Sequence, residues 1–325
     1  MPSWLSGLDE AGYGPLLGPL VIGMTTLATE TPIAPEAPWS LLSPAVTPPS
    51  RDKKGIAVAD SKKLHRPATG DLSGLEEGVL AFITSERGGE TPRTFRELID
   101  HLTMSRTDYL DDYPWYRDAD LELPFSASPL TLAGKMRKLE RALERSGVTV
   151  SEVRAIPLEV LEFNRALEAR GTKGEVNAWG IGRFLAWLWR QSERTNQVAW
   201  SDRLGGRQHY GPMLAPLFPG TRFQILGQER AEQAYRIEER DSDRTLEIHF
   251  AKEGEDRCFP TALASMTAKY VRELHMRLFN RWWQQHLPDL KKTAGYPQDA
   301  RRFLAEIEET RASLEISLGP LVRHR

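Results

Sequence analysis

The chain has 325 residues, of which 40% are hydrophobic and 27% are charged, and its formal net charge is −2, which is the profile of a soluble globular protein with a sizeable core. This near-neutral balance neither requires nor excludes a nucleic-acid partner, because its 43 Lys and Arg residues can gather on one face. A single cysteine, Cys258, excludes an internal disulfide and a cysteine-rich zinc site and favours a reducing compartment.

The first residues, "MPSWLSGLDE", lack the basic and apolar stretches of a secretory signal. The longest apolar run, "GPLVIGM", is far shorter than the ~20 residues that a membrane-spanning helix needs. We therefore expect a cytoplasmic protein that does not associate with a membrane.

The segment "GLDEAGYGPLLGPLVIG", residues 7–23, predicts a strand, a tight loop and a second strand. Its glycines and prolines are incompatible with a stable helix, whereas apolar residues stand on both sides of the loop. The adjacent acids Asp9 and Glu10 are therefore expected where the first strand ends.

The middle of the chain alternates irregular and helical patterns. Residues 31–52 are rich in proline and have no steady period, which indicates a surface loop or insertion. Helical spacing is found over residues 72–87, 130–147 and 175–191, and the segment "VRAIPLEVLEF" predicts a strand between the last two. The tryptophans of the 175–191 helix are assigned to the core because their spacing is helical.

The last third begins with a short strand, "QVAWSD", that stops at Asp202. Three more strands are predicted from "TRFQIL", "AYRIEE" and "TLEIHF", and a long helix is predicted over residues 260–286. Because strands and helices interleave, we expect an α/β fold with a central mixed sheet flanked by helices.

Acidic residues follow three separate strands: Asp9 with Glu10, then Asp202, then the run "KEGED" that ends at Asp256. Side chains at strand ends of α/β folds often converge, and clustered carboxylates repel one another unless a cation neutralises them. Oxygen ligands suit Mg²⁺ or Mn²⁺ better than zinc, and two such ions can hydrolyse a phosphodiester without a protein nucleophile. The alternative is that these acids are ordinary solvated turn residues.

Four segments together resemble the motifs of type 2 ribonuclease H, ribonuclease HII. These are "DEAGYGPLLGP" from Asp9, "DSKKL" from Asp60, "ASMTAKYVRE" from Ala264 and "GYPQDARRFL" from Gly295, and they occur in the order that the family has. The resemblance implies a ribonuclease H-like fold in one domain, residues 1–325. Insertions are expected at about 31–52 and 85–150, with a helical C-terminal segment at about 288–325.

The resemblance also implies a divalent-metal endonuclease that uses Mg²⁺ or Mn²⁺. Its substrate would be the RNA strand of an RNA/DNA hybrid or a ribonucleotide embedded in duplex DNA, and we expect it to act as a monomer. The four acidic metal ligands and catalytic residues of the family correspond to Asp9, Glu10, Asp202 and Asp256. For the fourth acid, Glu253 and Glu255 remain rivals of Asp256, because "KEGED" spreads the motif.

The substrate contacts implied by the family fall on Gly12, Tyr13, Gly14, Lys62, Lys63, Arg207, Lys269 and Tyr296. Glycines let backbone amides approach a sugar or phosphate, and the glycine loop of the family senses the ribose 2′-hydroxyl. Tyr13 is a departure, because the family has arginine there and tyrosine lacks the planar guanidinium fork.

Two other functions stay open from the sequence. One is a related metal-dependent nuclease with a different substrate, such as a DNA junction. The other is a catalytically weak or inactive protein of the same fold that only binds nucleic acid, which the altered fourth-acid motif permits. A dinucleotide-binding role for Gly12 and Gly14 is disfavoured, because a strand and not a helix follows.

Overall fold

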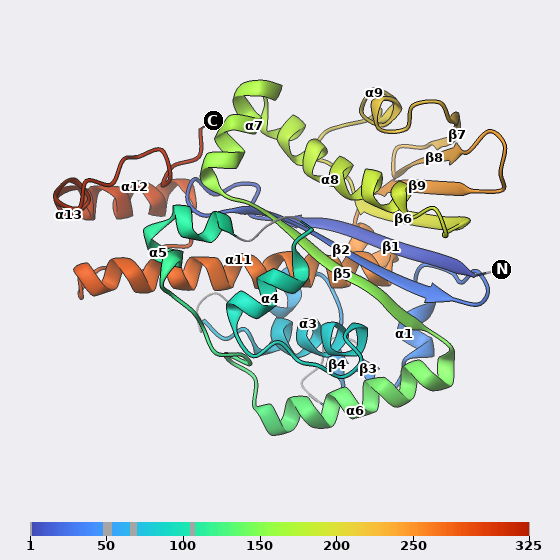
Figure 1. The fold of residues 1–325 in the computed structure, drawn as a ribbon, viewed down its shortest axis with the longest axis horizontal. Helices are drawn as coiled ribbons and strands as arrows, with labels where there is room; N and C mark the ends of the chain where they lie inside the picture. The colour runs from blue at the N-terminus through green and yellow to red at the C-terminus, as the bar shows by residue number, and fades with distance from the viewer. Residues whose placement is uncertain (1, 48–53, 66–69, 105–107, 325) are drawn as a thin grey trace.

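A seven-stranded mixed sheet forms the centre of the computed structural model, which describes residues 2–47, 54–65, 70–104 and 108–324 (Figure 1). Its strand order is β5-β2-β1-β6-β9-β8-β7, and β3 and β4 form a separate small pair. The strands are β1 (Ser3–Ala11), β2 (Leu20–Thr29), β3 (Val46–Thr47), β4 (Ile56–Ala57), β5 (Thr149–Leu158), β6 (Asn196–Asp202), β7 (Arg222–Gln228), β8 (Glu232–Glu238) and β9 (Thr245–Ala251).

The directions of the strands bring three strand ends to one edge of the sheet. β1 pairs antiparallel with β2 but parallel with β6, and β6 pairs parallel with β9. Parallel neighbours have their C-terminal ends on the same side, so the residues after β1, β6 and β9 are close in space although they lie far apart in the chain.

Helices cover both faces of the sheet, as Figure 1 shows with α8 above it and α11 and α3 below. The helices are α1 (Ala37–Leu41), α2 (Ser61–Leu64), α3 (Ser73–Glu86), α4 (Phe95–Leu102), α5 (Pro114–Arg117), α6 (Pro129–Ser146), α7 (Val160–Arg170), α8 (Lys173–Arg190), α9 (Gly211–Leu214), α10 (Gly254–Arg257), α11 (Phe259–His286), α12 (Pro297–Glu306) and α13 (Glu308–Ser313). The α/β fold with a mixed sheet flanked by helices that the sequence predicts is confirmed, including the helical C-terminal segment.

Successive side chains of β2 point to opposite faces of the sheet and pack in two different apolar cores. Ile22 packs in the core that contains Phe184 of α8, whereas Val21 packs in the core that contains Phe82 of α3 and Leu274 of α11. This is the expected result of a period of two in a strand that is buried on both faces.

Two glycines allow α11 to lie directly on the sheet. A Cβ at Gly7 would be 1.9 Å from the backbone nitrogen of Thr261, and a Cβ at Gly23 would be 2.3 Å from the carbonyl oxygen of Ala264. No side chain fits between backbones at these distances. The N-terminal turns of α11 are therefore held against β1 and β2 close to the end of β1.

The segments expected as insertions contain helices and a strand of their own. Residues 31–47 contain α1 and β3, while positions 48–52 lie outside the described residues. The 85–150 segment contains α4, a 3₁₀ turn (Asp108–Asp112), α5 and α6, and positions 105–107 lie outside the described residues. α6 ends at Gly147, whose φ of 66° terminates the helix in the left-handed conformation.

Candidate active site

The end of β1 directs its two acids to opposite faces of the sheet. Ser265 of α11 interacts with the carboxyl of Asp9 and lowers its pKa, and Asn177 of α8 does the same for Glu10, while the Ser265 hydroxyl also lies 3.1 Å from that of Ser61. Asp9 is only 7% exposed and Asn177 only 2%. The two adjacent carboxylates are thus each oriented by a polar side chain on the helix that covers their face.

The third and fourth acids come from β6 and from the turn after β9. Asp202 is the last residue of β6, and its Oδ1 accepts a hydrogen bond of 3.1 Å from the backbone N–H of Gly254. Glu255 is the next residue of α10 and is only 8% exposed. The contact between Asp202 and Gly254 therefore fixes α10 against the end of β6.

The pKa values of Asp9, Glu10 and Glu255 are raised by burial and by neighbouring carboxylates. Burial is the main cause and raises the pKa of Asp9 well above its usual range, and Glu10, Asp202 and Glu255 add to that rise. Burial likewise raises the pKa of Glu10 to about 7, with contributions from Asp202 and Glu255. Glu255 follows the same pattern, because burial and Asp202 raise its pKa. The site retains protons that ordinary surface carboxylates lose.

Asp256, which the sequence favoured as the fourth acid, lies in a different environment. Its side chain is 48% exposed and forms an ion pair with Lys63 of α2, at 2.5 Å and 2.7 Å from Nζ to the two carboxylate oxygens. Glu253 is also solvent-exposed and lies 3.5 Å from the ammonium of Lys252. Of the three acids in "KEGED", Glu255 is the one that interacts electrostatically with Asp9 and Glu10.

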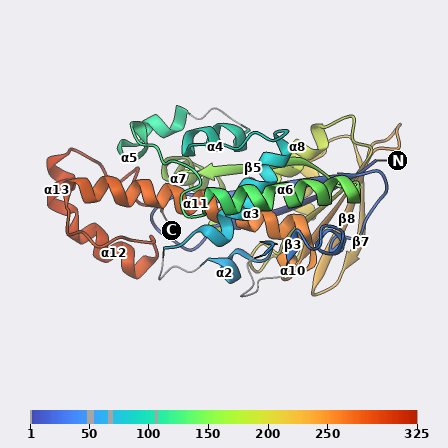
Figure 2. The same cartoon turned by 90° about the horizontal axis from the view of Figure 1, so that it is seen from below.

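The two lysines of α2 are likewise separated by the fold. Figure 2 shows α2 beside α10, which the ion pair of Lys63 also requires. Partial burial opposes protonation of Lys62, but the carboxylates of Asp60, Glu255 and Asp9 outweigh it and raise the pKa of its ammonium. Lys62 is therefore a cation within the field of the acids, while Lys63 neutralises Asp256.

The acids have the chemistry but not the assembled geometry of a cation site. Within the described parts of the chain, no three His, Cys, Asp or Glu side chains could together hold a metal ion as they stand. The donors nevertheless fit a hard divalent cation, because all are carboxylate oxygens and the Oε2 of Glu255 is buried with no hydrogen-bond partner among the described residues. Asp202 would exchange its bond to Gly254 for such an ion.

The glycine loop after β1 is open to solvent on one side and rigidly supported on the other. Gly12 has a φ of 89°, and its carbonyl accepts a hydrogen bond of 2.7 Å from the guanidinium of Arg323. Tyr13 is 40% exposed, and Tyr296 is 53% exposed with its ring 3.8 Å from where a Cβ of Gly14 would lie. The loop therefore presents one exposed aromatic ring of its own, Tyr13, and has a second, Tyr296, beside Gly14.

A cavity of about 360 Å³ extends from Glu10 and Tyr13 to the N-terminus of α8 and the loop after β6. Arg207 lines it and forms an ion pair with Glu175 of α8. Lys269 lies elsewhere on α11, where its ammonium is 2.7 Å from the carboxylate of Glu273. The fold thus brings Tyr13 and Arg207 to the cavity beside Glu10, and leaves Lys269 paired within its own helix.

Solved structures that this fold resembles include the ribonuclease HII of Archaeoglobus fulgidus in a complex with PCNA, with 15% identity, a TM-score of 0.40 and coverage of 99% of this chain and 94% of that one. Ribonuclease H2 of Pyrococcus horikoshii OT3 has 15% identity, a TM-score of 0.44 and coverage of 98% and 92%. Bst-RNase HIII in complex with Mn²⁺ has 14% identity, a TM-score of 0.40 and coverage of 98% and 66%.

The chain resembles type 2 ribonucleases H. The resemblance is one of overall fold at low identity, and neither a family model nor a curated protein sequence matches the chain. What the site can do therefore follows from the side chains of this protein. Among the described residues, no helix is long and apolar enough to cross a membrane.

Sequence reasoning missed Ser265 and Asn177, the two residues that orient Asp9 and Glu10. The signal for Asn177 was present, because it is a polar residue on the apolar side of the 175–191 helix, where a buried amide needs a partner. Ser265 stands in the "ASMTAKYVRE" segment, but its role depends on Gly7 and Gly23 allowing α11 close to β1, which a single helix pattern does not reveal.

Proposed function

We propose that this protein is a divalent-cation-dependent endonuclease that hydrolyses the RNA strand of an RNA/DNA hybrid or a ribonucleotide embedded in duplex DNA. The observation that carries the proposal is the convergence of Asp9, Glu10, Asp202 and Glu255 at one edge of the sheet, where burial and the neighbouring carboxylates raise the pKa of Asp9, Glu10 and Glu255. Buried carboxylates that lie close together repel one another unless a counter-ion is bound. Such clusters are typical of catalytic sites that hold a cation.

Asp9, Glu10, Asp202 and Glu255 are the residues that would hold Mg²⁺ or Mn²⁺. A bound divalent ion supplies charge stabilisation at a phosphodiester and acidifies water. Ser265 and Asn177 keep the carboxylates of Asp9 and Glu10 aimed at the strand edge. This positioning matters because carboxylate ligands are effective only where their orientation is fixed in advance.

The glycine loop supplies the contact with the sugar–phosphate backbone. Gly12 and Gly14 have no side chains to keep a ribose away from the loop amides, and the 2′-hydroxyl is the group that distinguishes RNA from DNA. Tyr13 in the loop and Tyr296 beside Gly14 offer exposed rings suited to packing on sugars or bases. Lys62 adds a positive charge for a phosphate beside the acids.

Cleavage of three matched duplexes tests the proposal: all-DNA, DNA with a single ribonucleotide, and RNA/DNA hybrid, each with Mg²⁺, Mn²⁺ or EDTA. We expect cleavage only of ribonucleotide-containing strands and only with a divalent ion. Asp9→Asn and Asp202→Asn should each lower the rate by at least about 100-fold while circular dichroism stays unchanged, because each removes an anionic ligand. Cleavage at the wild-type rate by either variant would contradict the proposal.

A second function, hybrid binding without hydrolysis, is favoured by one observation. As it stands, the Asp202 carboxylate accepts from the Gly254 amide, and the described residues contain no assembled three-ligand set. If the protein only binds hybrid, the wild type would bind it in EDTA and leave it intact with either metal. The same duplexes therefore separate the two functions.

A further inference from the structure

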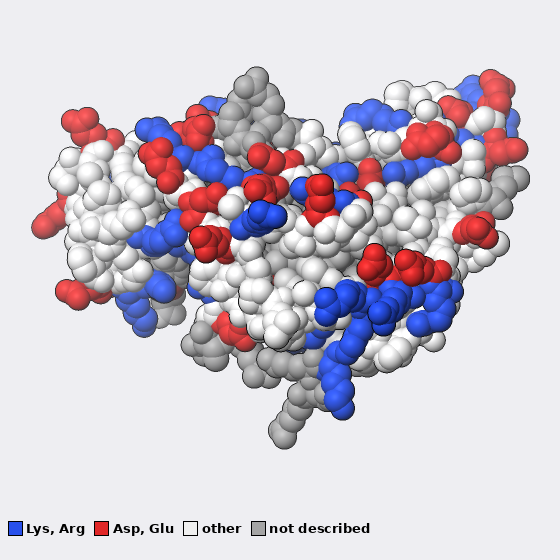
Figure 3. All heavy atoms as spheres, turned by 60° about the horizontal axis from the view of Figure 1, so that its bottom comes forward, with Lys and Arg blue, Asp and Glu red and all other residues white. Residues whose placement is uncertain are grey.

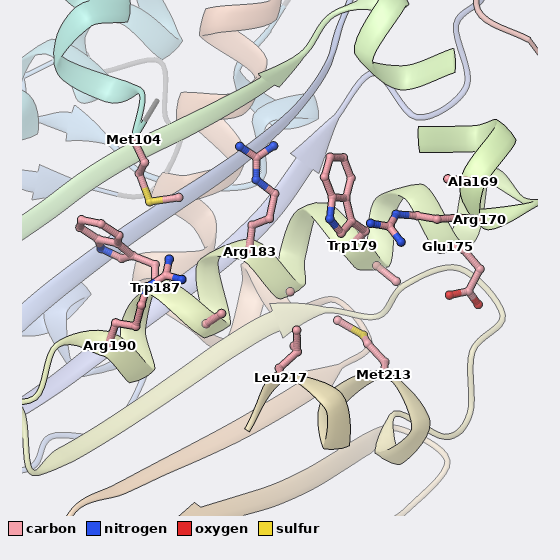
Figure 4. Close-up of a pocket in the computed structure, with 13 residues that line it drawn as sticks. Met104, Ala169, Arg170, Glu175, Trp179, Arg183, Trp187, Arg190, Met213 and Leu217 are labelled. Atoms are coloured by element: carbon pink, nitrogen blue, oxygen red, sulfur yellow. The ribbon is translucent and has the colours of Figure 1, made fainter. Parts of the chain in front are cut away.

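A groove on the outer side of α8 has a cavity of about 730 Å³ (Figure 4). Its floor is the stripe of α8 residues Trp179, Arg183, Trp187 and Arg190, which follow one another at helical spacing, and Arg170 from the end of α7 closes one side. Trp179 and Trp187 are partly buried: they pack against the apolar core beneath α8, as their spacing predicts, and they also line this groove.

Aromatic rings and guanidinium groups alternate along the groove. Trp179 has the guanidinium carbon of Arg170 4.6 Å from its ring centroid and that of Arg183 at 5.1 Å. Figure 4 shows Trp179 between these two arginines, and Trp187 beside Arg190 further along the helix. Because Arg170 is exposed, a flat group can add to this stack on its outer side.

The groove also carries uncompensated positive charge. Arg183 is neutralised by Glu162 at 3.0 Å, and Glu175, the one acid among the described residues that line the groove, is already paired with Arg207. Among the described residues, neither Arg170 nor Arg190 has an acidic partner within ion-pair distance. An occupant of this groove is therefore expected to be anionic as well as flat.

Glu175 connects the groove to the candidate active site, because it also lines the cavity that contains Glu10 and Tyr13. From Glu175 to Arg190 the helix rises about 22 Å at ~1.5 Å per residue, so the stripe is long enough for several nucleotides. One path thus runs from the acids at the sheet edge, past the ion pair of Arg207, and along α8.

We propose that this groove binds a single-stranded nucleic-acid arm that leaves the duplex next to the candidate acids. The proposal rests on the nuclease function proposed above and specifies its substrate as a duplex with an unpaired extension. The alternation of arginine and tryptophan is what favours a single strand, because unpaired bases stack on flat side chains while phosphates meet the charges, whereas a paired duplex hides its base faces.

Fluorescence anisotropy in EDTA tests the proposal without cleavage. The probes are one labelled RNA/DNA hybrid with blunt ends, the same hybrid with a DNA arm of about ten unpaired nucleotides at either end, and the hybrid lengthened by the same number of paired nucleotides. We expect the wild type to bind one arm-bearing hybrid about tenfold more tightly than the blunt one. Arg170→Ala with Arg190→Ala should remove that difference in affinity. The double variant should also reduce the slope of log K against log salt concentration by about 1.4, which is ~0.7 for each lost phosphate contact.

Arg137→Ala with Arg141→Ala is the matched control, because both arginines are exposed on α6, over the face where Figure 3 shows Lys and Arg side chains gathered. This variant loses the same charge and should keep the preference for the arm. Equal affinity of the wild type for all probes would overturn the proposal, and so would equal gains from the arm and from the paired extension. A preference for the arm without any cleavage in Mg²⁺ or Mn²⁺ would support the groove and overturn the nuclease function.

Discussion

Glu255 and Asp256 are adjacent in the chain but have opposite environments. Successive residues of a helical turn point about 100° apart, so when Glu255 faces the buried acids Asp256 must face outward, where Lys63 neutralises it. The energetic consequences differ as well. An exposed ion pair contributes little to the free energy of unfolding. A carboxylate held near other carboxylates, in contrast, changes the affinity of the site for a cation.

These two residues provide a matched pair of substitutions. Glu255→Gln is expected to lower the cleavage rate by at least about tenfold, because it removes one anionic ligand from the cluster, and Asp256→Asn is expected to change it by less than about threefold. Both remove one negative charge from α10, so a general effect of charge cannot explain a difference. Initial rates of hybrid cleavage in Mn²⁺ measure the difference between the two variants. A larger loss of rate in Asp256→Asn would identify Asp256 as the fourth acid of the site.

At the scale of elements, the glycine loop is held by the C-terminal segment. The backbone N–H of Leu16 donates to the carbonyl of Gly295 at 2.7 Å, and that of Arg323 donates to the carbonyl of Leu16 at 2.9 Å. The guanidinium of Arg323, only 1% exposed, donates to Gly12 as well. The tail therefore positions both the loop and Tyr296, which follows Gly295.

Replacing Arg323 with methionine is expected to loosen the loop more than it destabilises the protein. The bond to Gly12 is worth about 1.5–3 kcal/mol, but the variant also relieves the burial of a charged group whose Nε and Nη1 have no partner among the described residues. We expect the free energy of unfolding to change by about 1 kcal/mol and the affinity for hybrid to fall about tenfold.

Urea denaturation and anisotropy measure these two quantities for Arg323→Met. His324→Ala is the control, since the side chain of His324 is 57% exposed. Hybrid affinity equal to that of the wild type would show that Arg323 has only a structural role.

At the scale of the whole molecule, the site joins segments that are nearly 250 residues apart in the chain, from Asp9 to Glu255. Burying the acidic side chains of the site changes the free energy of unfolding in a way that depends on pH. The folded-state pKa of Glu10 is about 7, above its usual value of 4.5, so the folded protein holds this proton more strongly than the unfolded chain. Its contribution to stability is fully present below pH 4.5 and is lost as the pH rises through 7.

The free energy of unfolding of the wild type, measured in EDTA, should therefore fall relative to that of Glu10→Gln between pH 5 and pH 8, because glutamine cannot ionise. Adding Mg²⁺ or Mn²⁺ at pH 8 should stabilise the wild type more than the variant, since an ion that binds only the folded state shifts unfolding by mass action. Urea denaturation at several pH values measures both effects. A difference that does not depend on pH would mean that Glu10 has an ordinary pKa.

By itself the sequence determined the elements and the acids that end them. Periods of two and of 3.6 are local properties, so β1, α6, α8 and α11 could be predicted close to their observed bounds, and with them the positions of Asp9, Glu10 and Asp202 at strand ends. The mixed sheet followed from the interleaving of strands and helices.

Only the tertiary structure decided which side chains share one environment. Glu255 rather than Asp256, Lys62 rather than Lys63, the support of Gly12 by Arg323, and the place of the partly buried Trp179 and Trp187 in a groove all depend on contacts between distant segments. Local sequence patterns do not predict these contacts. Two adjacent residues of one turn have the same local pattern, and their environments differ only once another element packs against one of them. The physical reason is that burial and electrostatic coupling act through space and not along the chain.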